Sequence, residues 1–460
     1  MPSAEMTMAG LAGRRVLVLG TGREGSAIAD AIVPLATTVT AYDDSDGPSA
    51  AAWRERWGGR APLLVGAGAD LDPASFDVVI ASPGISKHHP VVRALRDAGL
   101  LITSGTALWM AEHHASTTGV TGSKGKSTTA SLIQHLGLAF GGHVALGGNI
   151  GIPLLSLAPA ERYVVELSSY QCSSLTVSPD VAVLTSLFPE HLDWHGSEQE
   201  YYRDKLNLIA HGPRVVVANS LDERLMRLLG ELHPGVEVEP GGSAGSFHLV
   251  EHDGSVWIAR RGEPLVERSR LALLGAHNAL NACLALAAVE AAGIAVTADG
   301  ETLRRAIESF RPLEHRLEPI ADPSGLTFVN DSLSTSPYAA IEALKAFTGP
   351  AVTLIVGGQD RGVDYRPLAD HLRAHPIAAV IGLPPSGERI LGTIGSAVPS
   401  YLVGDLPAAV TTARAVTPAE GYVLLSPAAP SYGVYRDYAD RAEQFKAAIR
   451  QTAPEPSETV

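Results

Sequence analysis

Short apolar runs recur along the chain, and each is followed by a turn and then by a helix-like segment. Segments 15–20 and 39–43 are the first two, and the second ends in the acid Asp43. Further runs of this kind lie at 77–84, 163–167, 181–185, 353–358 and 422–427. Short apolar runs bounded by turn signals predict buried strands, and strands that alternate with helices build parallel sheets. The pattern therefore predicts an α/β protein.

The order of these segments predicts three domains, which suits a chain of 460 residues. A Rossmann-like domain is expected over residues 10–106, and a central phosphate-loop domain with a mostly parallel sheet over 107–311. A second Rossmann-like domain is expected over 312–450, followed by a disordered tail over 451–460. An Ala/Leu-rich stretch over 271–292 predicts a long helix in the central domain.

A glycine-rich segment ahead of one predicted helix carries the most specific chemical signal. Glycines allow backbone N–H groups to converge on a phosphate, and the helix N-terminus adds the positive end of its dipole. Lys126 is then placed to reach the β- and γ-phosphates of ATP, and the Ser127 hydroxyl to hold Mg²⁺. The alternative is an ordinary glycine-rich turn with a solvated lysine, but such a turn would not need the glycine, lysine and hydroxyl residues at these particular positions. The segment is a compressed phosphate loop made of Gly122, Ser123, Lys124, Gly125, Lys126, Ser127 and Thr128.

Composition narrows the function classes. The net charge is −14 without a block of Lys or Arg, which argues against a nucleic-acid partner. The two cysteines, Cys172 and Cys283, provide neither a disulfide framework nor a zinc pattern, as is typical of a reducing compartment. Residues 1–13 lack a signal-peptide pattern, and Glu290 interrupts the longest apolar stretch. We therefore expect a cytoplasmic protein that does not insert into membranes.

Several polar residues follow the strands of the central domain. Glu166 ends an apolar strand, where it can complete Mg²⁺ coordination with Ser127 or cap the next helix; the phosphate loop favours the metal role. His191 is a candidate for binding a metal or a phosphate, whereas His195 can be structural. Lys205 on its own would be a surface lysine.

Two asparagines open the helix that follows residue 276. Asn278 and Asn281 lie one turn apart on one helix face. Their amide groups can bind the adenine or ribose of a nucleotide, or they can form a helix cap and a surface pair. Spacing alone leaves these two alternatives open.

Taken together, these motifs resemble the ATP-dependent Mur ligases of peptidoglycan synthesis. Their order and spacing match over roughly residues 11–449. The branch that the chain resembles adds glutamate to UDP-N-acetylmuramoyl-L-alanine. The motifs that carry the resemblance are the phosphate loop, Glu166-Leu167-Ser168-Ser169-Tyr170-Gln171, His191, Lys205, His277-Asn278-Ala279-Leu280-Asn281, His315-Arg316 and Asn330-Asp331-Ser332.

The resemblance implies a mechanism and a role for each motif. ATP phosphorylates the terminal carboxylate of the substrate, and the amine of the incoming amino acid attacks the acyl phosphate. Ser127 and Glu166 would hold one Mg²⁺, and His191 with a carbamylated Lys205 would hold a second. Lys126, His191 and Lys205 would be catalytic. At the nucleotide, the resemblance implies contacts from Asn278, Asn281, Arg316 and Asp331.

The first domain then resembles a UDP-sugar binder. Gly20, Gly22 and Gly25 form a G-x-G-x-x-G pattern that on its own is a weak signal of dinucleotide-dependent oxidoreduction. In the resemblance, the diphosphate, the uridine and the uracil pocket would be contacted by Thr21, Arg23, Asp43, Ser82 and Gly84. The muramoyl part and its phosphates would be contacted by Asn149, Ser168 and Gln171.

The chain departs from the usual D-glutamate ligase in the third domain. Leu333 stands where that ligase has a lysine, and Arg361 replaces another lysine that faces the glutamate carboxylate. Arginine binds carboxylates as a planar fork and not as a point charge, which suits a rearranged site. These features resemble an L-glutamate-adding variant, in which Arg361, Ser431 and Tyr438 would hold the glutamate and a separate epimerase would convert the product. The resemblance also implies a monomer.

Three other interpretations are weaker. D-glutamate addition remains the main alternative. A folylpolyglutamate synthase shares the phosphate loop and the ligation chemistry but not a UDP-type first domain. A regulator with a degenerate ATP site would lack one of Lys126, Glu166 and Lys205, and all three are present.

Overall fold

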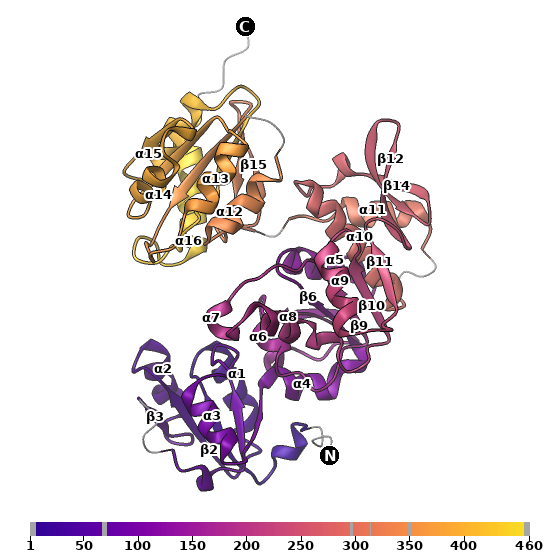
Figure 1. Ribbon diagram of the computed structural model, residues 1–460, viewed down its shortest axis with the longest axis vertical. Helices are drawn as coiled ribbons and strands as arrows, with labels where there is room; N and C mark the ends of the chain where they lie inside the picture. The colour runs from indigo at the N-terminus through magenta and orange to yellow at the C-terminus, as the bar shows by residue number, and fades with distance from the viewer. Residues whose placement is uncertain (1–5, 67–70, 295–297, 313, 348–350, 455–460) are drawn as a thin grey trace. The chain divides into compact units, whose positions relative to one another are not determined.

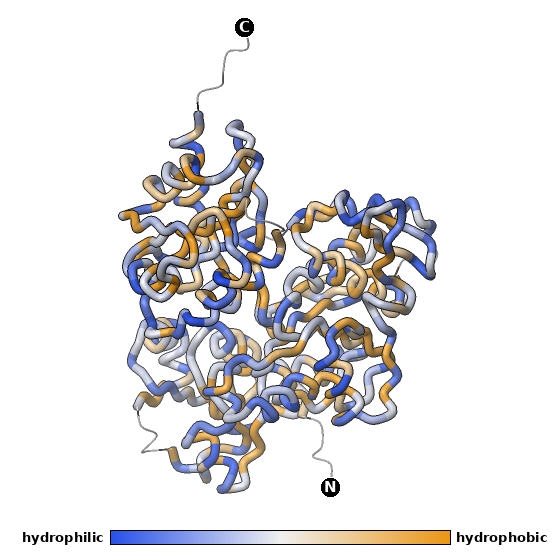
Figure 2. Tube along the Cα trace, turned by 45° about the horizontal axis from the view of Figure 1, so that its top comes forward, coloured by the Kyte–Doolittle hydropathy of each residue, from blue (hydrophilic) through white to orange (hydrophobic). Residues whose placement is uncertain are grey.

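The computed structural model describes residues 6–66, 71–294, 298–312, 314–347 and 351–454 (Figure 1). The chain divides into two compact units, one containing Met1–Arg270 and Asn278–Phe310 and the other Leu271–His277 and Arg311–Val460. The described strands form four sheets, of which three are parallel or largely parallel, so the predicted α/β class is confirmed. Figure 2 shows hydrophobic stretches alternating with hydrophilic ones along the chain.

The first sheet has five parallel strands in the order β3-β2-β1-β4-β5. The strand order reverses between β1 and β4, and ligands of open α/β sheets bind at such a point, beyond the carboxyl ends of the strands. The elements of this part are β1 (Arg15–Leu19), α1 (Arg23–Ile32), β2 (Thr38–Asp43), α2 (Pro48–Trp57), β3 (Leu63–Val65), β4 (Val78–Ala81), α3 (Pro90–Asp97) and β5 (Leu101–Thr103).

The turn between β1 and α1 depends on two of its glycines. Gly20 has φ +89°, in the left-handed region. A Cβ at Gly25 would lie 2.0 Å from the carbonyl oxygen of Gly20, whereas a Cβ at Gly22 would meet nothing within 4 Å. The helix therefore approaches the strand end closely only because position 25 has no side chain.

The second sheet has six parallel strands in the order β11-β10-β9-β6-β8-β7. The later strands lie on both sides of β6, with β8 and β7 on one side and β9 to β11 on the other, so the phosphate loop begins where the strand order reverses. The elements are α4 (Gly105–His113), β6 (Thr117–Thr121), α5 (Lys126–Ala139), β7 (Val144–Gly148), β8 (Arg162–Glu166), α6 (Ser169–Cys172), β9 (Val181–Leu184), α7 (Leu192–His195), α8 (Glu198–Leu206), β10 (Val215–Asn219), α9 (Glu223–Leu232) and β11 (Val238–Gly241).

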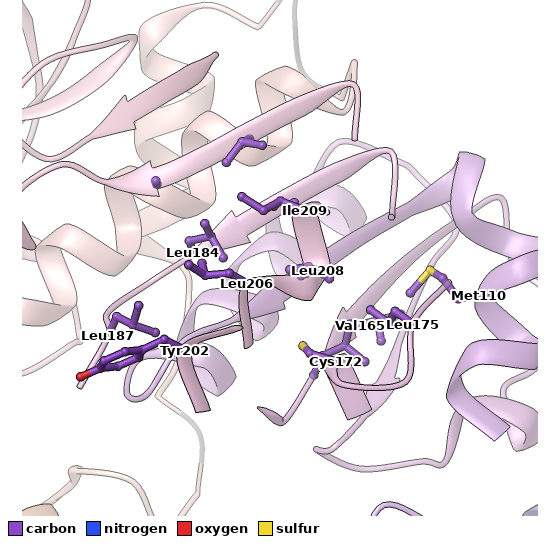
Figure 3. Close-up of a cluster of buried hydrophobic side chains, with 14 of the residues drawn as sticks. Met110, Val165, Cys172, Leu175, Leu184, Leu187, Tyr202, Leu206, Leu208 and Ile209 are labelled. Atoms are coloured by element: carbon purple, nitrogen blue, oxygen red, sulfur yellow. The ribbon is translucent and has the colours of Figure 1, made fainter. Parts of the chain in front are cut away.

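A buried apolar cluster packs α8 against this sheet (Figure 3). Tyr202 and Leu206 of α8 belong to the same cluster as Leu184 of β9, Val165 of β8 and Cys172 of α6. Fully burying a side chain of this size contributes about 1.5–3 kcal/mol. The cluster therefore anchors α8, the helix that carries Lys205.

The first unit ends in a small antiparallel sheet and two helices, namely β12 (Phe247–His252), β13 (Ser255–Arg260), β14 (Glu263–Glu267), α10 (Ala276–Ala291) and α11 (Gly300–Glu308). The helix expected over 271–292 begins only at Ala276, so the prediction was too long at its start. Gly275 has φ +90°, a conformation that an α-helix cannot contain. Within the described ranges, no helix is both long and apolar enough to cross a membrane.

The second unit has a six-stranded sheet in the order β15-β16-β20-β17-β18-β19, in which only the β15–β16 pair is antiparallel. The carboxyl ends of β16, β17 and β20 lie side by side. The elements are β15 (Glu318–Ala321), β16 (Thr327–Asn330), α12 (Pro337–Leu344), β17 (Val352–Gly357), α13 (Arg366–Ala374), β18 (Ala379–Leu383), α14 (Gly387–Ile394), β19 (Ser400–Leu402), α15 (Leu406–Val416), β20 (Tyr422–Leu425) and α16 (Tyr438–Gln451).

Short 3₁₀ turns also occur in the described residues, namely η1 (Ala9–Leu11), η2 (Pro73–Ser75), η3 (His114–Ser116), η4 (Leu154–Ser156), η5 (Asn207–Ile209), η6 (Arg268–Arg270) and η7 (Gly395–Ala397). The tail expected over 451–460 begins at the last residue of α16, and its residues 455–460 lie outside the described part of the chain.

We expect Gly25→Ala to lower the melting temperature and Gly22→Ala to change it little. The new Cβ at position 25 must push the Gly20 carbonyl away, and overpacking of this kind costs about 1–3 kcal/mol. Thermal unfolding of both variants, followed by circular dichroism, tests this. Equal melting temperatures for the two variants would contradict the close approach described above.

Candidate functional site

The phosphate loop connects β6 to α5, and its two glycines have positive φ angles. Gly122 has φ +149° and Gly125 has φ +89°. A Cβ at Gly122 would lie 2.0 Å from Thr185 Oγ1, and a Cβ at Gly125 would lie 2.5 Å from Asn281 Oδ1. Both positions therefore require glycine for space as well as for conformation.

The segment after β9 holds the loop in shape. The Ser123 hydroxyl donates to the Phe188 carbonyl at 2.7 Å, and the Ser123 N–H donates to the Ser186 carbonyl at 2.7 Å. The Ser123 hydroxyl also lies 2.8 Å from the Tyr201 hydroxyl, and the Lys124 ammonium pairs with Glu190 at 3.0 Å. Ser123 thus uses its hydroxyl and its N–H within the protein, where they shape the loop.

Ser127, Glu166 and Asn149 meet at the start of α5. Ser127 Oγ donates to Glu166 Oε2 at 2.5 Å, and Asn149 Nδ2 donates to Glu166 Oε1 at 2.7 Å. The α6 helix is capped instead by Ser168, whose hydroxyl accepts from the Gln171 N–H at 3.2 Å. The cap suggested as an alternative use of Glu166 is therefore supplied by another residue.

The donor set beside α5 fits a hard cation. A serine hydroxyl and a carboxylate are oxygen ligands of the kind that Mg²⁺ prefers, usually together with phosphate oxygens of a substrate. In the part of the chain that the structure describes, no group of three or more His, Cys, Asp or Glu side chains is arranged to hold a metal. A cation here would therefore depend on Ser127 and Glu166 together with ligands that come from outside the protein.

Two lysines converge on the same loop. Lys126 Nζ donates to the Ser123 carbonyl at 2.9 Å, and Lys205 Nζ donates to the Gly122 carbonyl at 2.8 Å. Lys205 is only 2% exposed. Burial, together with the nearby Lys126 ammonium, lowers the pKa of Lys205 from 10.5 to about 7. Much of Lys205 is therefore a neutral, nucleophilic amine near neutral pH.

The two histidines of the loop before α8 have different surroundings. His191 precedes α7, has φ +55° and is exposed, with its ring 5.1 Å from that of Tyr170. His195 is fully buried, and its ring nitrogens lie 2.6 Å from Asp204 Oδ2 and 2.9 Å from Ser169 Oγ. His195 is thus structural, as the sequence suggested, whereas His191 is accessible to a ligand.

The asparagines of α10 face the phosphate loop. Asn281 Nδ2 donates to Asn278 Oδ1 at 2.9 Å, and both residues are buried. Because the Asn281 carboxamide packs against Gly125, the pair does not form the surface interaction that spacing left open.

In the first domain, three predicted residues gather where the strand order reverses. Asp43 Oδ2 accepts from the Thr21 N–H at 2.9 Å and from its hydroxyl at 2.6 Å, and Ser82 Oγ donates to the Gly20 carbonyl at 3.2 Å. Burial opposes ionisation of Asp43, but the bonds from Thr21 outweigh it and lower the pKa of this carboxyl group. Arg23 Nη1 donates to the Gly151 carbonyl at 3.0 Å, next to the loop that carries Asn149.

The second unit presents its own predicted residues at the ends of β16, β17 and β20. Asp331 is buried and accepts hydrogen bonds from the hydroxyls of Ser334 and Ser426; burial raises the pKa of this carboxyl group to about 6. Arg361 is exposed, and its Nε donates to Gln359 Oε1 at 2.9 Å. The other predicted residues of this unit are Arg316, the buried Ser431 and the exposed Tyr438.

Sequence reasoning missed Arg441 on α16, which is fully buried. Its guanidinium donates to the Ser332 carbonyl at 2.8 Å and to the Ala429 carbonyl at 3.1 Å. Burial lowers the pKa of Arg441 to about 10. Arg441 therefore joins the loops that follow β16 and β20. The available signal was its helical spacing with Phe445 and Ala448, which share its buried face.

Comparison with known proteins identifies the family. Residues 120–289 match the Mur ligase middle domain. A protein of Micromonospora sp. named UDP-N-acetylmuramoyl-L-alanine--L-glutamate ligase is 50% identical over 456 residues, which cover 98% of this chain and 100% of the relative. A protein of the same name from Salinispora tropica is 50% identical over 97% of this chain and 100% of the relative. The chain belongs to the Mur ligase family.

Solved structures show the same fold. The MurF ligase from Thermotoga maritima, solved in complex with ADP, matches with a TM-score of 0.56 at 18% identity, over 97% of each chain. Mur ligases are ATP-dependent enzymes of peptidoglycan synthesis that join a carboxylate to an amine, and this Mur ligase is accordingly an acid–amino-acid ligase. The phosphate loop described above is the part of the fold that such chemistry requires.

We expect Lys205→Met to raise the melting temperature at pH 7, because methionine removes a buried charge whose desolvation destabilises the folded state. The pKa of Lys205 is lowered to about 7 in the folded state from 10.5, so the unfolded state binds more protons between these values. The destabilisation by Lys205 is thus complete below pH 7 and disappears as the pH rises toward 10.5.

The measurement is thermal unfolding of the wild type and of Lys205→Met in CO₂-depleted buffers between pH 6 and 9. The advantage of the variant is expected to shrink as the pH rises. A gap that stays constant with pH would contradict the lowered pKa.

Proposed function

We propose that this Mur ligase adds L-glutamate to UDP-N-acetylmuramoyl-L-alanine with hydrolysis of ATP to ADP and phosphate. The observation that carries the proposal is the convergence of Lys126, Lys205 and the Ser127–Glu166 pair on one phosphate loop. The names of the two relatives that are 50% identical support the substrates.

In the proposed reaction, the γ-phosphoryl group of ATP moves to the terminal carboxylate of the L-alanyl substrate and ADP leaves. The glutamate amine then attacks the carbonyl carbon of the acyl phosphate, loses a proton and displaces phosphate to form the amide. Two anions must approach each other in the first step, so positive charge at the loop is required. Lys126 would supply this charge to the phosphates, within the loop Gly122–Thr128.

Mg²⁺ would neutralise phosphate oxygens at two places. Ser127 and Glu166 would hold one ion, as their oxygen donors and their contact at 2.5 Å suggest. His191 and Lys205 would serve the second ion, with Lys205 carbamylated. The neutral amine of Lys205 would attack the carbon of CO₂ and lose one proton, which converts the amine into an anionic carbamate with two oxygen donors.

We assign the UDP-sugar to the first domain (10–106) and the nucleotide to the central domain (107–311), with Arg316 and Asp331 contributing from the third domain (312–450). The UDP contacts would come from Thr21, Arg23, Asp43, Ser82 and Gly84. The muramoyl contacts would come from Asn149, Ser168 and Gln171, and the adenine contacts from Asn278 and Asn281.

Selection of L-glutamate would lie in the third domain. Arg361 is exposed beside the end of β17 and offers a planar fork for a carboxylate, while Leu333 removes a cation. Ser431 and Tyr438 would complete this pocket. The product would pass to an epimerase that inverts its terminal glutamate, and we propose a monomeric enzyme of the cytoplasm.

The decisive experiment is phosphate release from ATP with UDP-N-acetylmuramoyl-L-alanine and either L- or D-glutamate. We expect turnover with L-glutamate and at least about 100-fold less with D-glutamate, because an inverted α-carbon misplaces one carboxylate and leaves its partners in the pocket unpaired. Turnover with D-glutamate alone would make this an ordinary D-glutamate ligase, and turnover with neither would refute the proposed substrates.

We expect Lys126→Ala and Lys205→Ala both to lose at least about 100-fold in kcat, as removal of a charge-stabilising group does. Added formate or acetate should restore part of the activity of Lys205→Ala, because a short carboxylate can occupy the place of the carbamate. Lys126→Ala is the matched control and should not respond. Steady-state phosphate release measures both, and equal responses of the two variants would argue against carbamylation.

A further inference from the structure

The segment that follows β4 in the first domain is bonded to α7 and α8 of the central domain. Ser86 Oγ donates to the Trp194 carbonyl at 2.7 Å, and His88 Nε2 lies 3.1 Å from the His195 carbonyl oxygen. Between them, Lys87 Nζ donates to Asp204 Oδ1 at 2.7 Å and to Glu200 Oε2 at 3.0 Å. Three consecutive residues therefore contact the helices on either side of residue 197.

Asp204, the partner of Lys87, is itself bonded to residues in the interior. Asp204 is 7% exposed, and its second oxygen, Oδ2, lies 2.6 Å from His195 Nδ1. A carboxylate only accepts hydrogen bonds, so Nδ1 carries the proton. His195 Nε2 in turn lies 2.9 Å from Ser169 Oγ, at the start of α6. The result is one continuous chain of polar contacts from Lys87 to Ser169.

The order Ser169, His195, Asp204 resembles the array that activates a serine nucleophile. Ser169 is 2% exposed and His195 is fully buried, so no substrate reaches the hydroxyl. A fully bonded polar network in an interior is rigid and specifies one arrangement of the elements that it joins. This network therefore fixes the mutual positions of α6, α7 and α8.

The proposed second metal site is formed by Lys205 on α8 and by His191, which directly precedes α7. Asp204 and Lys205 are consecutive on α8, and successive side chains on a helix point about 100° apart. While Asp204 faces Lys87 and His195, Lys205 faces the Gly122 carbonyl. Rotation of α8 about its axis would move both side chains together. His195 is the last residue of α7, whose first residue directly follows His191.

We propose that Lys87 is a positioning residue that couples the UDP-sugar site to the metal and phosphate site. Lys87 lies close in sequence to Ser82 and Gly84, which follow β4 at the proposed uracil pocket. Contacts of the UDP-sugar with this segment would be transmitted through Lys87 to Asp204, and through Asp204 to the orientation of Lys205. The inference rests on the proposed function, because it takes UDP-N-acetylmuramoyl-L-alanine as the ligand of the first domain.

The test is calorimetric titration of the full chain with a non-hydrolysable ATP analogue and Mg²⁺, with and without saturating UDP-N-acetylmuramoyl-L-alanine. In the wild type we expect the UDP-sugar to tighten the binding of the analogue about 10-fold, a typical coupling between two sites. In Lys87→Met this ratio should fall below about 2-fold, while the affinity for the analogue alone stays unchanged. Lys87→Arg keeps the charge and should restore most of the ratio.

Arg227→Met is the matched control, because it removes an exposed ion pair with Glu231 within α9 of the same unit. It should keep the wild-type ratio. Lys87→Met combined with Asp204→Asn should lose no more coupling than Lys87→Met alone, since both act through one contact. Lys87→Met with the wild-type ratio would overturn the inference, as would a wild type that binds both ligands without coupling. A wild type that does not bind the UDP-sugar at all would instead refute the proposed function.

Discussion

Two lysine side chains lie against one short loop, and the cost of holding positive charge there is the main constraint on the structure of the site. Lys126 and Lys205 both donate to carbonyls of the phosphate loop, and Lys205 is nearly excluded from water. Burial and the nearby Lys126 ammonium both disfavour a positive charge on Lys205, so the pKa of Lys205 is lowered. The same burial that destabilises the ammonium makes the amine reactive. The rest of the site is arranged around this pair: the glycines shape the loop, Glu166 contacts Ser127 at its end, and α8 holds Lys205 in place.

The sequence located the parts of the site that follow directly from strand ends. Glu166 closes a strand and Ser127 begins a helix, and parallel strands bring such positions to one edge, so their contact at 2.5 Å could be anticipated. Gly125 and Asn281 belong to distant segments, and their packing depends on how α10 lies against the loop. No local pattern encodes that approach.

Other contacts could not be predicted from the sequence, because the residues that form them are far apart along the chain. Ser123 looked like a phosphate ligand, but its contacts with Phe188 and Tyr201 depend on tertiary packing. No local pattern marks Lys87, because its partner Asp204 lies 117 residues further along the chain. Arginine is usually exposed to solvent, and the burial of Arg441 is explained by its hydrogen bonds to oxygens of surrounding loops, among them the carbonyls of Ser332 and Ala429. Polar groups inside a fold are thus the least predictable from composition and periodicity.

Because Asp204 and Lys205 are adjacent on α8, insertions and deletions in the first two turns of this helix would disturb both residues at once. The hydroxyl of Ser197 accepts from the Glu200 N–H and so sets where the helix begins. One added or deleted codon between Ser197 and Asp204 would turn both functional side chains by about 100°, away from the loop and the neighbouring domain. Substitutions on the outer face leave that geometry intact. Length variation is therefore expected to collect in surface connections, while the distance from Ser197 to Lys205 stays constant.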